Sequence, residues 1–196
     1  MADKAKKKVV QALLERHGRT FAVEAGIRLR HAPAPLFRLL VLSMLLSARI
    51  AAGNAVRAAK ALVKKYGTPK KLAGATWQQR VDVLTSHGYK RYDESGADQL
   101  GDTAQRVLDE YGRLKAFKGI GNVGADIFLR EVQGVWDEFQ PYADKRVLRA
   151  AKRLKLGGGP KALARLVDKK HLPRLEAALV RVELAGAHDQ IRAQAS

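Results

Sequence analysis

The pattern of apolar and polar residues along the chain is helical almost throughout. Apolar residues recur every three or four positions, and the strict alternation of a half-buried strand is almost absent. Ala, Leu, Lys and Arg, which favour helices, are frequent along the whole sequence. We therefore expect an all-α protein, with helices over residues 4–16, 36–50, 54–66, 76–87, 93–111, 125–135, 144–154, 161–169 and 173–185.

Local residue choices predict where several of these helices begin. Thr76 and Gln79 have the spacing of a capping box, while Asn54 and Asp144 are expected to cap the helices that follow them. The helix over 36–50 is apolar on every side, which predicts a central position surrounded by other helices. Residues 21–35 are expected to be irregular.

The charge of the chain points to a polyanionic partner. Among 196 residues, 37 Lys and Arg stand against 19 Asp and Glu, which gives a formal net charge of +18. Neutralisation of phosphates and release of their counterions reward such dense positive charge. Nucleic acid is therefore the favoured partner, ahead of an anionic membrane or a surface that is charged only for solubility.

The absence of cysteine excludes several classes of chemistry. Disulfides, thiolate zinc sites, cysteine nucleophiles and iron–sulfur clusters held by thiolates are not available to this chain. The histidines lack ligand spacing, so we expect neither a metal nor another cofactor. The N-terminus lacks the long apolar region of a secretory signal, and the apolar stretch 39–46 is too short for a bilayer span. A cytoplasmic protein is expected, associated with the nucleoid if the source is bacterial.

Residues 117–128 contain the most informative glycine pattern. Gly119 to Gly124 spells a dinucleotide-binding fingerprint, but the charged residues 113–118 cannot form the buried strand that this reading needs. The pattern favours a helix-hairpin-helix, in which glycines permit a tight bend and the second helix offers free N–H groups to a phosphate. A plain turn between two helices is the alternative. The expected backbone-binding residues are Lys118, Gly119, Gly121, Val123 and Gly124.

Three motifs together resemble the endonuclease III superfamily, the helix-hairpin-helix (HhH-GPD) DNA glycosylases with a Gly/Pro-rich loop and a key aspartate. Residues 45–48, Leu-Leu-Ser-Ala, are similar to a helix end of that family. Residues 117–125 resemble its hairpin, and residues 141–147 resemble the segment that carries its catalytic acid, here Asp144. The three motifs span roughly half to two-thirds of the chain in the family's order.

The resemblance implies a two-lobed, all-α glycosylase fold with a DNA cleft between the lobes. The central lobe would comprise residues 33–143, and residues 1–32 with 144–196 would form the other. The chain departs from the family pattern in several ways, among them a short first helix of the hairpin. Val123 occupies the position of the nucleophilic lysine, Lys118 replaces the hairpin proline, and no cysteines exist for the family's iron–sulfur cluster.

The predicted chemistry is hydrolysis of the N-glycosidic bond of a damaged or mismatched base. A carboxylate at Asp144 would stabilise the charge that builds on deoxyribose, although it could also serve only as a helix cap. Without a lysine at position 123, the expected enzyme is a monofunctional glycosylase of base-excision repair with little AP lyase activity. Candidates for the duplex wedge or the base pocket, each of which could instead be an ordinary surface or packing residue, are Arg49, Tyr89, Tyr142 and Lys145.

Two other functions remain open from the sequence. The chain could be a non-catalytic helix-hairpin-helix protein that binds DNA, or a bifunctional lyase that uses a non-standard lysine, Lys145. In each case the expected partner is double-stranded DNA. For the monofunctional glycosylase and the bifunctional lyase, that DNA would contain damaged bases. No membrane or protein partner is expected, and a monomer is the simplest assumption.

Overall fold

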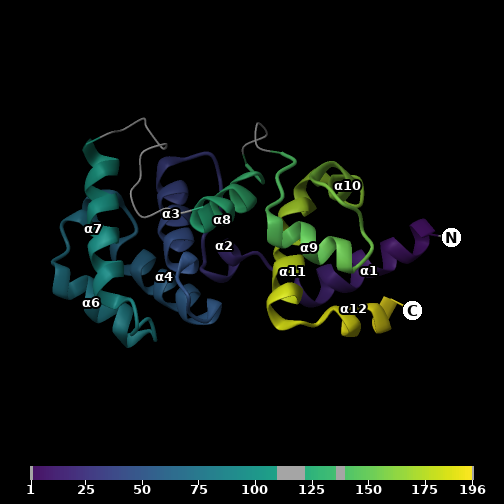
Figure 1. Cartoon of the computed structure of the whole chain (residues 1–196). Coiled ribbons are helices and arrows are strands. Elements are labelled where there is room, and N and C mark those ends of the chain that lie inside the picture. The colour runs from purple at the N-terminus through teal and green to yellow at the C-terminus, as the bar shows by residue number, and fades with distance from the viewer. Residues whose placement is uncertain (1, 110–121, 136–139, 196) are drawn as a thin grey trace. The chain divides into compact units, whose positions relative to one another are not determined.

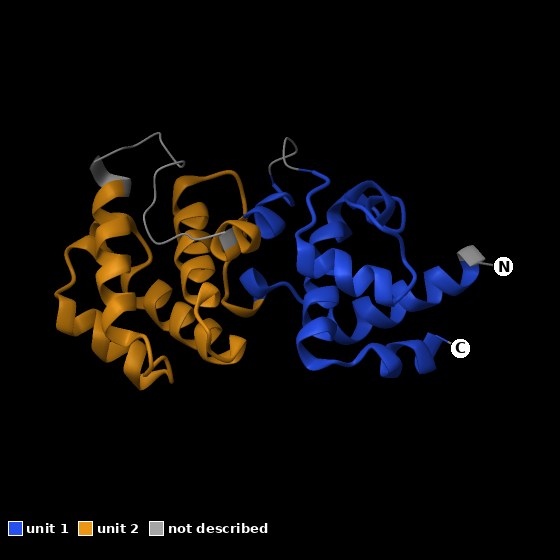
Figure 2. Ribbon diagram, in the orientation of Figure 1, with its two compact units in different colours: residues 1–23, 129–196 blue, residues 24–128 orange. Residues whose placement is uncertain are grey.

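The computed structural model describes residues 2–109, 122–135 and 140–195. Over these residues every regular element is a helix (Figure 1), which confirms the predicted all-α class. The chain forms two compact units, shown in blue and orange in Figure 2. Unit 1 comprises residues 1–23 and 129–196, and unit 2 comprises residues 24–128.

Unit 2 is organised around a central apolar helix. Helix α3 buries residues on all its faces, including Leu39 and Leu42, as its sequence predicts. It packs against α4, while α7 packs against α5 and α6. The helices of unit 2 are α3 (Pro33–Ser47), α4 (Ala52–Tyr66), α5 (Pro69–Ala73), α6 (Trp77–Ser86), α7 (Asp93–Asp109) and the first part of α8 (Asn122–Val132). Within the described ranges, no helix has both the length and the hydropathy needed to cross a membrane.

Short polar contacts fix the ends of the unit 2 helices. The predicted capping box is present at α6: Thr76 Oγ1 accepts from the Gln79 N–H, and Gln79 Oε1 accepts from the Thr76 N–H. After α6 the chain turns at Gly88, whose φ of +84° favours glycine. A side chain at Gly88 would also meet Asn54, which lies about 3.2 Å from the position of the missing Cβ.

Unit 1 is organised around α11 (Leu172–Ala185), which packs against α1 (Ala2–His17) and α9 (Lys145–Arg153). Helix α11 buries most of its residues, and Gly186, with a φ of +65°, ends it in a left-handed conformation. Helix α1 also packs against α12 (His188–Ala195). The remaining elements are α10 (Pro160–Ala164) and the 3-10 helix η3 (Lys169–His171), and the short α2 (Phe21–Glu24) lies at the boundary of the units.

The structure corrects three local predictions. A helix over 161–169 is wrong, because α10 ends at Ala164 and the chain is extended at Asp168 before η3 begins. Asn54 does not cap α4, which begins at Ala52; its side chain donates instead to the Gly88 carbonyl over 2.9 Å. Residues 21–35 are not wholly irregular, since they contain α2. The sequence patterns also miss α5 and α12, which are too short for a clear periodicity.

The boundary between the units falls inside α8. Residues up to Phe128 belong to unit 2 and residues from Leu129 to unit 1, whereas the sequence-based lobes, 33–143 and 1–32 with 144–196, place both boundaries later. The last turns of α8 belong with unit 1 because their polar side chains bond within it. For example, Glu131 accepts a hydrogen bond from the Phe21 N–H over 3.1 Å. The arrangement of two lobes around a DNA cleft stays a prediction.

Candidate functional site

Asp144 begins helix α9 and caps it. Its Oδ1 accepts hydrogen bonds from the backbone N–H groups of Arg146 (2.8 Å) and Val147 (3.0 Å). The first N–H groups of a helix have no partner within the helix, and a carboxylate there also interacts favourably with the helix dipole. The cap predicted from the sequence is therefore confirmed, and it fixes the orientation of the carboxylate.

The second carboxylate oxygen of Asp144 is held by a buried arginine. Arg130 Nη1 lies 2.5 Å from Asp144 Oδ2, and the two side chains are only 4% and 5% exposed. Arg130 comes from α8, so the ion pair joins the last turns of α8 to the start of α9 within unit 1. An ion pair in so dry a place is held strongly once formed, because water screens it little.

Gln133, the first residue after α8, holds the backbone just before Asp144. Its Oε1 accepts from the Tyr142 N–H (3.0 Å), and its Nε2 donates to the Tyr142 carbonyl (3.2 Å). Gln133 Nε2 also donates to Glu176 Oε2 on α11 (2.6 Å) and to the Arg130 carbonyl (3.1 Å). Gln133 is fully buried, so one amide connects α8, α11 and the segment that leads into α9.

Two further carboxyl groups are buried beside this network. Burial raises the pKa of Glu176 to about 9, against the opposing effects of the Arg130 charge and the Gln133 hydrogen bond. Burial likewise raises the pKa of Glu131, again opposed by Arg130. At neutral pH Glu176 is therefore an uncharged acid. The carboxyl group that contacts Arg130 is that of Asp144. We call Arg130, Gln133, Asp144 and Glu176 the α8–α9 network.

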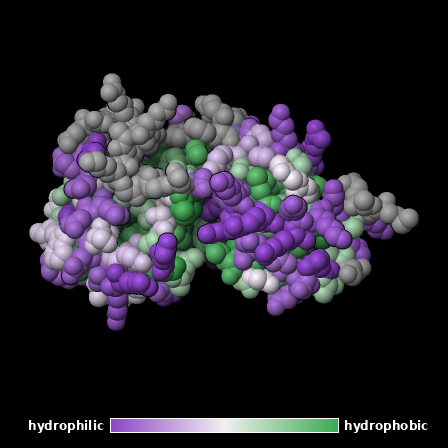
Figure 3. Space-filling model, viewed as in Figure 1, coloured by the Kyte–Doolittle hydropathy of each residue, from purple (hydrophilic) through white to green (hydrophobic). Residues whose placement is uncertain are grey.

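The outer face of α9 and the segment after it are strongly basic. No acidic residue lies between Asp144 and Asp168, whereas this stretch contains eight basic residues: Lys145, Arg146, Arg149, Lys152, Arg153, Lys155, Lys161 and Arg165. Lys145, Lys152 and Lys155 are exposed. Two of the arginines, Arg149 and Arg153, lie 3.4 Å from the carboxylate of Glu183. Figure 3 shows hydrophilic side chains gathered over this part of unit 1.

Only part of the predicted hairpin site belongs to the described chain. Val123 is 46% exposed near the start of α8, and Gly124 is buried. Lys118, Gly119 and Gly121 lie outside the described residues. Their contact with a DNA backbone stays a prediction.

Three of the predicted site residues, Tyr142, Asp144 and Lys145, lie close together because they are neighbours in the sequence. Lys145 is exposed in the first turn of α9, and Tyr142 is half-buried, with its backbone held by Gln133. Arg49 belongs to unit 2, where it is exposed in the connection between α3 and α4. Its role as a wedge stays a prediction.

Tyr89 does not have the exposure that a wedge residue needs. Its ring is 3% exposed in the core of unit 2, and its hydroxyl donates to the Leu45 carbonyl over 3.3 Å. Burial also raises its pKa to about 12. The ring would have to leave the core before it could enter a duplex, so we describe Tyr89 as a packing residue. Lys90 and Arg91 are the exposed residues of this turn.

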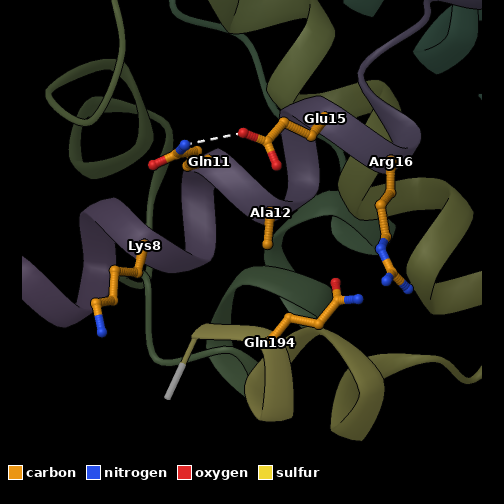
Figure 4. A pocket seen from close by; sticks show the side chains of 6 residues that line it. All are labelled: Lys8, Gln11, Ala12, Glu15, Arg16 and Gln194. Atoms are coloured by element: carbon orange, nitrogen blue, oxygen red, sulfur yellow. Dashed lines mark hydrogen bonds between the residues drawn. The ribbon is translucent and has the colours of Figure 1, made fainter.

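A separate surface pocket of about 440 Å³ lies on α1 and α12 in unit 1 (Figure 4). Two of its lining residues on α1 are joined by a hydrogen bond, from Gln11 Nε2 to Glu15 Oε1 over 2.8 Å. None of its lining residues belongs to the predicted site or to the α8–α9 network: Lys8, Gln11, Ala12, Glu15, Arg16 and Gln194.

The roles of Arg130, Gln133 and Glu176 are not predicted from the sequence. A signal existed for Glu176, since it is the one acid within the apolar run from Leu175 to Val180. An acid inside a buried helical face needs a partner or a proton. Arg130 and Gln133 gave no comparable signal, because polar residues are common on one face of any helix at the surface.

The described part of the chain has an all-α fold similar to that of endonuclease III, as the sequence resemblance implies. Two solved structures are similar to the chain over most of its length. One is a trapped endonuclease III–DNA covalent intermediate in an estranged-adenine complex, with 19% identity, and the other is a non-covalent endonuclease III–DNA complex, with 18% identity. Each match has a TM-score of 0.51 and covers 90% of this chain and 85% of the other. No family model and no curated protein matches the sequence.

Proposed function

We propose that the protein binds double-stranded DNA and hydrolyses the N-glycosidic bond of a damaged or mismatched base, with Asp144 as the catalytic carboxylate. The observation that carries this proposal is the fixed carboxylate at the start of α9, beside a strongly basic surface, in an endonuclease III-like fold. The similar solved structures contain DNA, which supports a DNA substrate for this protein. Their low identity leaves the reaction to be tested directly.

The chemistry requires a negative charge close to deoxyribose. As the bond between C1′ and the base breaks, the electron pair leaves with the base and positive charge builds on the sugar. A carboxylate held in place stabilises that charge without having to reorganise, and water then adds at C1′ and loses a proton. The bonds from Arg130 and the α9 backbone hold Asp144 in one orientation, which suits this electrostatic role.

We propose further that the enzyme is monofunctional. Strand cleavage through a covalent imine needs an amine nucleophile at the reacting sugar. Val123 occupies the position at which the resemblance would place a lysine, and an alkyl side chain cannot form an imine. The expected product is therefore an intact abasic site, which breaks only on treatment with alkali.

The basic surface of α9 supplies sequence-independent affinity for the duplex. Exposed lysines such as Lys145 and Lys152 gain by neutralising phosphates and releasing counterions. Helix α9 would hold the DNA backbone close to Asp144, because the Asp144 carboxylate lies at the start of this same basic helix. Binding should therefore weaken steeply as the salt concentration rises.

The test is base release from duplexes that each contain one lesion. The panel comprises uracil, thymine glycol, 8-oxoguanine, 7-methylguanine and a mismatched adenine, each incubated with wild-type protein and then heated with or without alkali. Asp144→Asn should slow release by roughly 100-fold or more, because an amide cannot offset the sugar charge. The matched control is Asp189→Asn, which removes an aspartate that is 92% exposed and also pairs with an arginine. It should behave as wild type.

A second function, DNA binding without catalysis, is favoured by the environment of Asp144. Both its oxygens already have partners, and the side chain is 5% exposed. This function predicts salt-dependent binding and no base release from any duplex of the panel. Strand breaks without alkali would instead contradict the monofunctional proposal. If borohydride then traps a covalent complex with wild type but not with Lys145→Ala, Lys145 is the nucleophile of a lyase.

A further inference from the structure

Asp144 has more partners than a helix cap requires. The cap uses Oδ1 alone, through the N–H groups of Arg146 and Val147. Oδ2 is taken by Arg130, whose side chain is 4% exposed. Removing an arginine and a carboxylate from water is costly, and an apolar pair of the same volume often gives equal or better stability. A gain in stability is therefore a weak explanation for this ion pair. Its clear effect is to restrict the Asp144 carboxylate to one orientation.

The backbone before Asp144 is restricted as well. Gln133 makes two hydrogen bonds to Tyr142, one to each polar group of its backbone. Gln133 is itself fixed by Glu176, whose pKa of about 9 keeps it uncharged at neutral pH, so the amide does not have to solvate a second buried anion. Asp144 is thus located both through its own carboxylate and through the peptide two residues earlier.

We propose that Arg130 and Gln133 are positioning residues for the Asp144 carboxylate, Arg130 through the carboxylate itself and Gln133 through the Tyr142 backbone. This inference rests on the proposed glycosylase function. Neither residue has to touch DNA: their effect is on the rate of bond cleavage, because supporting residues that lock a reacting group in place act on geometry more than on affinity. The juxtaposition comes from Arg130 in the last turn of α8 and Gln133 directly after the helix ends.

The experiment compares Arg130→Met, Arg130→Lys and Gln133→Met with wild type. The matched control is Arg192→Met, since Arg192 also lies 2.5 Å from an aspartate oxygen in unit 1 but is 49% exposed. For each protein we would measure the thermal midpoint, the Kd for undamaged duplex, and the single-turnover rate on the lesion that wild type releases fastest. Only proteins with a cooperative thermal transition enter the comparison of rates.

Arg130→Met should lower the rate by about 100-fold while the Kd changes by less than about threefold, as expected for a misplaced reacting group. Arg130→Lys keeps the charge and should recover about tenfold of that loss, and Gln133→Met should lower the rate by about tenfold. If Arg130→Met does not fold, the other two variants carry the test. The inference is overturned if the folded variants have wild-type rates. It is also overturned if their rates and their affinities for DNA fall in the same proportion.

A failure of the proposed function itself is recognised separately. If wild type releases no base from any duplex, the glycosylase proposal fails, and positioning is then tested from the ¹³C carboxyl resonance of Asp144. That resonance should move in Arg130→Lys and Gln133→Met and stay in place in Arg192→Met. An unmoved resonance in the first two variants overturns the positioning role.

Discussion

The two units bury different kinds of side chain. Among the described residues of unit 2, the buried polar side chains besides the Tyr89 hydroxyl are Ser43 and Thr103. Unit 1 buries a charged pair, Arg130 and Asp144, together with several other polar groups: Thr20, Glu131, Gln133, Glu176 and His188. An apolar core is the cheaper way to stabilise a helical unit, because buried polar groups have to recover their lost hydration.

Some of the buried polar atoms have no hydrogen-bond partner. Among the described residues, buried side-chain atoms without a hydrogen-bond partner occur in both units. They include Ser43 Oγ, Tyr66 OH and Thr103 Oγ1 in unit 2, and Arg130 Nε, Glu131 Oε2 and Glu176 Oε1 in unit 1. Each such buried atom costs on the order of 1–3 kcal/mol. Sites where the rules of stable packing are broken are the places to look for function. What distinguishes unit 1 is that it buries ionisable side chains, so unit 1 is where candidate chemistry is expected.

The largest expected effect on stability is in the apolar core of unit 2. Leu42→Ala removes a side chain of α3 that is 0% exposed, and it should lower the free energy of unfolding by about 2–5 kcal/mol. Thermal or urea unfolding of the full chain measures the change. Leu184→Ala is the control, because Leu184 is 56% exposed and its loss should change stability little. Equal effects of the two substitutions would contradict the proposed importance of this core.

A pH-dependent effect is expected from unit 1. Glu176 stays protonated in the folded protein until about pH 9 but ionises near pH 4.5 when exposed. Its contribution to stability is therefore fully present below pH 4.5 and declines as the pH rises toward 9. Glu176→Gln keeps an uncharged group of the same shape, so it should flatten part of this decline.

The measurement is the thermal midpoint of both proteins between pH 5 and pH 9. Wild type should lose roughly 5–10 °C more than the Glu176→Gln variant over that range. Some decline should remain in the variant, since the pKa of Glu131 is also raised by burial. Parallel curves for the two proteins would show that Glu176 does not titrate as a buried acid.

A smaller effect is expected on DNA affinity. The double variant Lys145→Ala with Lys152→Ala removes two exposed cations of α9 and should lower the slope of log K against log salt by up to about 2. Filter binding or fluorescence anisotropy at several salt concentrations gives the slope. The control is Lys64→Ala on α4 of unit 2, also exposed. If Lys64→Ala changes the slope as much per charge, the attraction comes from net charge and not from α9.

The smallest effect is expected at the capping box of α6. Thr76→Ala removes the side-chain oxygen that accepts from the Gln79 N–H, and should cost about 1 kcal/mol of stability. Chemical denaturation detects a change of this size. DNA binding and base release should be unchanged, and a loss of either would show that unit 2 contributes more than a scaffold near this helix.

The local sequence was sufficient to predict most helices and one feature of the site. The capping box of Thr76 and Gln79 and the Asp144 cap were predictable because a cap is formed by residues two or three positions apart. The central position of α3 followed from its apolar faces. Short elements such as α5 and α10 were missed or misplaced, because their packing partners decide their extent more than their own residues do.

The helical class, the dense positive charge and the aspartate at the start of α9 follow from the amino-acid sequence alone. The burial of Tyr89, the pairing of Arg130 with Asp144 and the bond from Gln133 to Glu176 depend on tertiary packing. Caps and periodicity depend on neighbours within a turn or two, so a single chain segment contains them. A buried ion pair across 14 positions or an amide bonded across 43 depends on how distant helices pack, which no local pattern encodes.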